Sequence, residues 1–147
     1  MDMAGEGVDR RPLIAFSAVF EGTEEIAEAR RLACAFLDEV ESVHGLKVCD
    51  RAVALVELVV SELVTNTRKY APGPSEMTLE VHDGCVEVSV WDSNPNPPAV
   101  LPPDPFRVGQ HGLEIIVAAA RTFRVHREPF GKRITASITL ADDPGPN

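Results

Sequence analysis

Glu62 and Asn66 form the residue pair in this sequence with the clearest capacity for chemistry. They stand four positions apart in a helical run, so their side chains lie one turn from each other on the same side of the helix. Magnesium prefers oxygen ligands, and the Asn66 carbonyl can supply one while the metal keeps waters and phosphate oxygens. Glu62 can accept a proton or hold a metal-bound water. The pair predicts a magnesium-nucleotide site. A helix-capping Asn beside a solvated Glu is an equally good interpretation of the same two residues.

Two further segments offer groups that suit a nucleotide. Asp92 ends a strand of alternating valines, directly before a loop rich in proline. A carboxylate there can accept a hydrogen bond from the exocyclic amine of a base, although an Asx-type turn over residues 92–95 explains it nearly as well. Residues 109–112, Gly-Gln-His-Gly, precede a helical run. Backbone N–H groups at such a helix start can face a phosphate, but most Gly-x-x-Gly pairs only cap or turn a chain.

Hydrophobic periodicity predicts the elements that hold these residues. Thr23 is the candidate N-cap of the first helix, with Glu24 and Glu25 as acids in its first turn. The predicted order is a strand (Leu13–Phe20), a helix that ends near His44, a helix from about Lys47 to Tyr70, a hairpin that turns at Asp83-Gly84, an irregular loop (Pro95–Pro105), a helix (Gly109–Arg121) and a hairpin around Pro129-Phe130-Gly131. This order predicts an α/β sandwich with the helices on one face of a mixed sheet.

The longest predicted helix places the candidate pair at the border between two faces. At about 100° per residue, Glu62 and Asn66 align with Leu55 and Leu58 on the flank of the apolar side. Solubility alone gives no reason for a carboxylate at that position. The apolar arc itself comprises Ala52, Val53, Val56, Val59, Val60, Leu63 and Val64, and the opposite side carries Glu57, Ser61, Thr65 and Arg68.

Composition limits the classes of protein to which the chain can belong. Of its 147 residues, 44% are apolar and 25% charged, which is typical of one soluble globular domain. No signal peptide or run of ~20 apolar residues occurs, so we expect a cytoplasmic protein without membrane contact. The net charge of −9 argues against direct nucleic-acid binding, and it fits either simple solubility or attraction of a basic protein partner.

Cysteines, histidines and short motifs exclude several other kinds of site. Cys34, Cys49 and Cys85 lack CxxC spacing and lie among apolar neighbours, so we expect reduced core residues. The four histidines are scattered without metal-ligand spacing, and we interpret three of them as surface residues. No GxSxG, HExxH or GxxxxGK[ST] motif occurs, which disfavours a serine hydrolase, a zinc protease and a P-loop nucleotidase.

Residues 61–71, Ser-Glu-Leu-Val-Thr-Asn-Thr-Arg-Lys-Tyr-Ala, resemble the N box of the superfamily of ATPases that includes gyrase, heat-shock chaperones, histidine kinases and mismatch-repair proteins. The chain is most similar to the short bacterial anti-sigma-factor serine kinases. In those proteins a strand-end Asp, a glycine-containing lid and a terminal hairpin follow the box, and all four features occur here in this order. The resemblance implies a Bergerat-type ATP-binding fold, an α+β two-layer sandwich with a mixed, mostly antiparallel sheet. It implies a domain over 11–140, between a flexible N-terminus (1–10) and a flexible tail (141–147).

Carried over by position, the resemblance implies roles for individual residues. Asn66 binds Mg²⁺, Glu62 is the catalytic base on a partner's hydroxyl, and Asp92 binds the adenine amine of ATP. Further nucleotide contacts are implied for the glycine boxes and the turn into the last strand, at Asn94, Gly109, His111, Gly112, Leu113, Gly131 and Lys132. The implied activity is that of a homodimeric protein serine/threonine kinase. It transfers the γ-phosphoryl of ATP to an anti-sigma-factor antagonist and sequesters a sigma factor.

Four positions depart from the family's usual residues. Thr67, Tyr70, Asn94 and His111 stand where Ala, His, Gly and Arg are usual. A side chain at Asn94 crowds the nucleotide where glycine lets the backbone approach, and loss of an Arg removes charge stabilisation near the phosphates. The alternative function is therefore a catalytically inactive nucleotide-binding module, or one without nucleotide, that regulates a protein partner. A third reading is the catalytic fragment of a histidine kinase that acts in trans.

Overall fold

The computed structural model describes residues 14–94 and 112–141. Along these segments the chain forms β1 (Ala15–Phe20), α1 (Ile26–Ser42), α2 (Asp50–Tyr70), β2 (Ser75–His82), β3 (Cys85–Asp92), α3 (Gly112–Ala119), β4 (Thr122–Glu128) and β5 (Gly131–Thr139). The element order is the one predicted from periodicity. The expected flexible N-terminus (1–10), the proline-rich loop and residues 142–147 of the tail lie outside the described residues.

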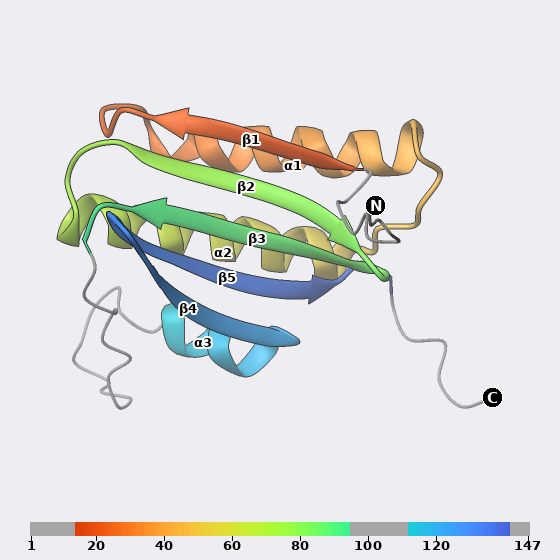
Figure 1. Cartoon of the computed structure of the whole chain (residues 1–147). Helices are drawn as coiled ribbons and strands as arrows, with labels where there is room; N and C mark the ends of the chain where they lie inside the picture. Colours follow the sequence, from red (N-terminus) through yellow and green to blue (C-terminus); the bar gives the residue numbers. More distant parts are fainter. Residues whose placement is uncertain (1–13, 95–111, 142–147) are drawn as a thin grey trace, which may run out of the picture.

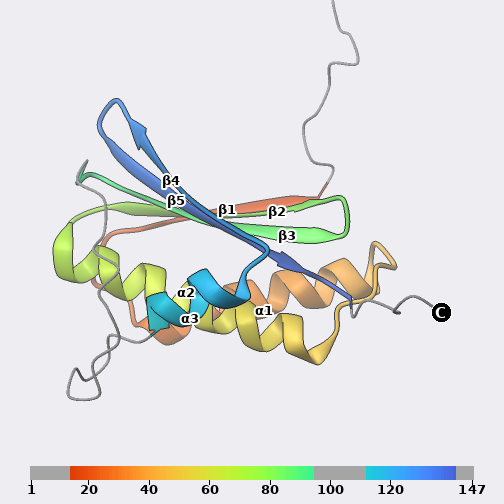
Figure 2. The same ribbon diagram turned by 90° about the horizontal axis from the view of Figure 1, so that it is seen from below.

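The described strands make one sheet in the order β1-β2-β3-β5-β4. Each neighbouring pair is antiparallel, so the sheet expected to be mixed is antiparallel throughout these five strands. The three helices cover one face of the sheet, and its other face is open (Figure 2). This arrangement confirms the two-layer α/β sandwich. It arises because alternate strand residues are apolar, which gives the sheet one face to bury.

The core lies between the sheet and α2. Val86, Val88 and Val90 of β3 point into it and are almost fully buried. The predicted apolar arc of α2 covers them, and all its members are buried except the partly buried Val53. Cys49 and Cys85 are buried free thiols, as expected, whereas the free Cys34 is only half-buried. No helix in the described segments is both long enough and apolar enough to cross a membrane.

The start of α1 differs from its prediction. The helix begins at Ile26, and Glu25 occupies the N-cap position without a side-chain capping bond, so Thr23 is not the cap. The Glu24 carboxylate turns back and accepts hydrogen bonds from the backbone N–H groups of Glu21 and Gly22, at 3.0 and 3.1 Å. Glu24 therefore closes the turn between β1 and α1, because a local acceptor competes with the helix for backbone donors.

Candidate functional site

The two flanks of α2 face different neighbours. On one flank, the Arg30 guanidinium of α1 donates a hydrogen bond to Ser61 Oγ at 3.1 Å, and the Cys34 thiol donates to Glu57 Oε2 at 3.0 Å. Burial and this carboxylate raise the pKa of Cys34 to about 11. The polar side of the helix predicted from the sequence therefore lies against α1. Its charged groups are half-buried and form contacts between helices.

Glu62 and Asn66 lie on the other flank of α2, by the helical spacing that separates them from Ser61. α3 packs against α2 on that side, so α2 lies between α1 and α3 (Figure 1). Both side chains are half-buried, and neither forms a hydrogen bond or ion pair with another described residue. The predicted pair is thus placed on one turn, between solvent and core, on the flank of α2 opposite the one that α1 covers.

Burial raises the pKa of the Glu62 carboxyl, because desolvation disfavours its ionised form. The Lys69 ammonium, two turns further along α2, opposes that rise through its positive charge. A carboxylate whose pKa lies nearer to neutrality accepts a proton more readily under physiological conditions than a solvated one. Burial consequently gives the Glu62 carboxyl a higher proton affinity than that of a fully solvated glutamate.

Asp92 is held at the end of β3 by a buried ion pair. The Lys132 ammonium lies 2.9 Å from Asp92 Oδ1, and the exposed fractions of the two side chains are 5% and 3%. The same oxygen accepts a hydrogen bond from the backbone N–H of Asn94 at 2.8 Å, which is the predicted Asx-type contact. Lys132 also donates to the Asn94 carbonyl at 3.0 Å. β3 and β5 pair directly, and this pairing brings the predicted Asp, Asn and Lys together.

The ends of β3 and α2 are tied to each other by Asn94. Its side-chain amide donates a hydrogen bond to the backbone carbonyl of Tyr70, the last residue of α2, at 3.0 Å. Tyr70 follows Asn66 by one helical turn. The amide of Asn94 therefore joins the strand end that carries Asp92 to the helix end that carries Asn66, and this gives a structural reason for the side chain that replaces the family's glycine.

Gly131 allows the last hairpin to approach Asp92. An added Cβ at Gly131 would overlap the backbone carbonyl of Asp92, and the backbone φ of +158° is one that other residues rarely adopt. Only glycine accommodates both features. The close approach sets the start of β5, and with it the position of Lys132.

The remaining predicted residues divide into two groups. Gly112 begins α3, and Leu113 is buried in the hydrophobic core, so Leu113 contributes to the placement of α3. Gly109 and His111 lie outside the described residues. Sequence reasoning missed the Asp92–Lys132 ion pair, since the partners are 40 positions apart and no local pattern links them.

Comparisons with known proteins bear on the family and on the fold. A family model described as the histidine kinase-like ATPase domain matches residues 21–138. No curated protein sequence matches the chain. Among solved structures, the chain is similar to the RsbU and RsbW domains of Rv1364c from Mycobacterium tuberculosis, with a TM-score of 0.59 and 19% identity. That match covers 86% of this chain but only 32% of the mycobacterial one.

Two histidine kinases are also similar in structure. AdeS from Acinetobacter baumannii matches with a TM-score of 0.49 and 19% identity over 86% of this chain and 68% of its own. The histidine kinase domain of the blue-light activated EL346 from Erythrobacter litoralis matches with a TM-score of 0.48 and 19% identity, over 76% and 61%. At 19% identity the mycobacterial match bears on the fold alone, and TM-scores below 0.5 are too low for the two kinases to support a conclusion. The family match spans well over half of the sequence and includes α2, β3 and all of β5 except its last residue. The chain therefore belongs to the histidine kinase-like ATPase domain family.

Proposed function

We propose that this domain binds ATP with Mg²⁺ beside the α3 flank of α2 and transfers the γ-phosphoryl group to a serine of an anti-sigma-factor antagonist. The observation that carries the proposal is the half-buried Glu62–Asn66 pair, which forms no hydrogen bond or ion pair within the described part of the chain. Family membership supports ATP as the ligand. The amide oxygen of Asn66 suits a hard cation, and one or two protein ligands suffice for magnesium that also binds phosphate oxygens.

Each named group has a distinct task in this proposal. Asn66 supplies an oxygen to the metal, whose charge would stabilise the phosphates. Glu62 accepts the proton of the serine hydroxyl as the serine oxygen bonds to the γ-phosphorus and the bond from phosphorus to ADP breaks. Asp92 Oδ1 is already engaged by Lys132, so the adenine amine would donate to Oδ2, which a carboxylate can offer at the same time.

Calorimetric titration of magnesium-ATP into the purified protein tests the binding step. We expect binding by the wild type and sharp weakening in Asn66→Ala, because the substitution removes the metal ligand. Thr65→Ala is the matched control, since Thr65 is a neighbouring half-buried polar residue outside the α3 flank. Equal affinity in the wild type and Asn66→Ala would contradict the assignment of the site.

Transfer is tested with radiolabelled ATP and each candidate anti-sigma-factor antagonist of the source cell. Label on an antagonist serine is expected with the wild type and not with Glu62→Gln, which keeps the shape but cannot accept the proton. A nucleotide-binding module that grips its partner without transfer is the second candidate, and His111, at the position where the family usually has an Arg near the phosphates, favours it. Retained ATP affinity without label on any serine would establish that candidate.

The proposal extends to protein partners and assembly. A kinase of this type would sequester a sigma factor and act as a homodimer, and the net charge of −9 would favour a basic partner surface. Light scattering of the purified protein tests the dimer. Co-purification with each sigma factor of the source cell, at low and high salt, tests sequestration. A monomer that retains none of them would contradict this part of the proposal.

A further inference from the structure

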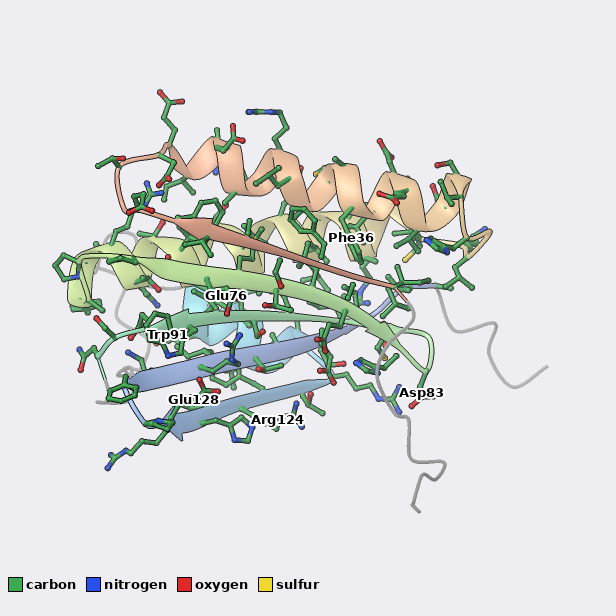
Figure 3. The ribbon with its side chains drawn as sticks, turned by 45° about the horizontal axis from the view of Figure 1, so that its top comes forward. Phe36, Glu76, Asp83, Trp91, Arg124 and Glu128 are labelled. Atoms are coloured by element: carbon green, nitrogen blue, oxygen red, sulfur yellow. The ribbon has the colours of Figure 1, made fainter. Side chains whose placement is uncertain are left out.

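The open face of the sheet carries a cluster of three potential metal ligands near the β2–β3 turn. Glu80 and His82 lie on β2, and Glu87 lies on β3. All three side chains are half-buried. They belong to the face that the helices leave uncovered, which is seen in Figure 3 with Arg124 on β4 and Asp83 at the turn.

The strand register brings the three side chains together. Glu80 and Glu87 are directly paired across β2 and β3, and His82 follows Glu80 by two positions on the same face. His82 Nε2 lies 3.2 Å from Glu80 Oε1. One donor atom from each residue can be chosen so that all three lie within 4.8 Å of one another. Ligand atoms at zinc distances in a tetrahedral site lie about 3.3 Å apart, so small side-chain rotations suffice.

The backbone that holds these ligands is a tight hairpin. Asp83 and Gly84 are its only turn residues and have φ angles of +49° and +77°, as a type I′ turn requires. Such a turn determines the register of both strands. The ligand positions are therefore set by a rigid element, which reduces the ordering cost of metal binding.

The charges of the cluster favour a divalent cation. Two carboxylates directly opposite each other on a sheet repel. Arg124 Nη2 approaches Glu87 Oε2 only to 3.8 Å, and its side chain is 50% exposed, so it compensates this repulsion weakly. A dication between Glu80 and Glu87 would neutralise both. The His82 imidazole would provide the nitrogen ligand that zinc accepts and that magnesium or calcium rarely takes.

We propose that Glu80, His82 and Glu87 form a zinc site on the open face of the sheet. The protein supplies one imidazole nitrogen and two carboxylate oxygens, and the fourth tetrahedral position stays open to water or to a group of a partner. The site is separate from the proposed nucleotide site, which lies on the helical side of the molecule (Figure 2).

Titration of Zn²⁺ alone into the chelator-treated full chain tests the proposal by calorimetry. One equivalent of zinc is expected to bind with the wild type. His82→Ala and Glu87→Gln should each weaken binding by about 100-fold or more, because loss of outer groups that only orient ligands already costs 10- to 100-fold. Zinc should also raise the thermal midpoint of the wild type and leave that of Glu87→Gln unchanged.

Two control variants separate this cluster from other zinc ligands. His126→Ala removes an exposed imidazole from the same face of the sheet, and Cys85→Ser removes the thiol paired with His82 in the register. Both should keep wild-type affinity. The proposal is overturned if the wild type takes up no zinc, if Glu87→Gln binds as tightly as the wild type, or if either control loses binding. Glu87→Gln preserves side-chain shape, so the test stands even if His82→Ala fails to fold.

Discussion

Replacement of Lys132 by methionine removes the ammonium that neutralises Asp92. In the native fold Nζ lies 2.9 Å from Asp92 Oδ1 and 3.0 Å from the Asn94 carbonyl, and both charged side chains are about 95% buried or more. Methionine keeps the length and fills the space, but among the described residues Asp92 then retains only the Asn94 N–H as a donor. Loss of one partner from a buried pair costs about 3–5 kcal/mol, a large share of the roughly 5–15 kcal/mol by which domains are stable.

Urea unfolding provides the assay, with the single Trp91 as fluorescent probe and circular dichroism as the second signal. With an m value of about 2 kcal/mol per molar, a loss of ~4 kcal/mol lowers the midpoint by about 2 M. Arg133→Met is the matched control. Its guanidinium is 25% exposed and bonds Glu76 and Glu128 on the open face, so its loss should cost less than about 1 kcal/mol.

A double-mutant cycle with Asp92→Asn isolates the ion pair. The double variant should be more stable than the sum of the two single losses predicts, because neither charge then remains buried alone. A loss below about 1 kcal/mol in Lys132→Met, or strict additivity in the cycle, would refute the view that this pair secures the strand ends at the site.

Three further predictions follow from individual contacts. Gly131→Ala should lower the free energy of unfolding, measured in urea, far more than Gly84→Ala. An added Cβ at position 131 overlaps the Asp92 carbonyl, whereas one at position 84 meets no atom within 4 Å. Equal losses of stability in the two variants would contradict the close approach of Gly131 to Asp92. Glu62→Gln should raise the thermal midpoint of unfolding at pH 7 and abolish phosphoryl transfer. The raised pKa of the Glu62 carboxyl means that the stability of the fold declines as pH rises through that pKa, and glutamine removes this cost. A lower midpoint in the variant would contradict the prediction. The N–H groups of Glu21 and Gly22 lower the pKa of the Glu24 carboxyl, so its stabilising contribution is present above the ordinary value of 4.5 and is lost as pH falls through the folded value. Glu24→Gln should therefore reduce the loss of stability on acidification, measured as the slope of unfolding free energy against pH in this range. An unchanged slope would count against the role of Glu24.

The proposed zinc ligands Glu80, His82 and Glu87 form no linear motif, because they lie on two paired strands. The histidines lack helical or loop spacing for a metal, so local spacing predicts no metal site. Glu80 and His82 have the i, i+2 spacing of one strand face, and the Asp83-Gly84 turn predicts that Glu87 pairs with Glu80. The signal was present, but it becomes visible only when both strands of the hairpin are considered at once.

Patterns along the chain were sufficient to predict the helices and strands and the part of the candidate site that lies on α2. The apolar arc of α2 and the one-turn spacing of Glu62 and Asn66 depend on helical periodicity, which neighbouring residues determine. The resemblance of residues 61–71 to an N box likewise indicated the family, and the match over 21–138 confirms it. The prediction of Thr23 as the N-cap of α1 was wrong, because Thr23, Glu24 and Glu25 are all local candidates to accept hydrogen bonds from nearby backbone N–H groups. The Glu24 carboxylate accepts those of the preceding turn.

Only the tertiary structure decided what surrounds those residues. β5 lies between β3 and β4, and this non-local pairing places Lys132 against Asp92 across 40 positions. The contact of Asn94 with Tyr70 and the enclosure of Glu57 and Ser61 by α1 arise in the same way, from packing between segments far apart in sequence. Local periodicity determines which side of an element is apolar, but the partner of each polar side chain depends on which elements meet, because hydrogen bonds and ion pairs form only at contact distance.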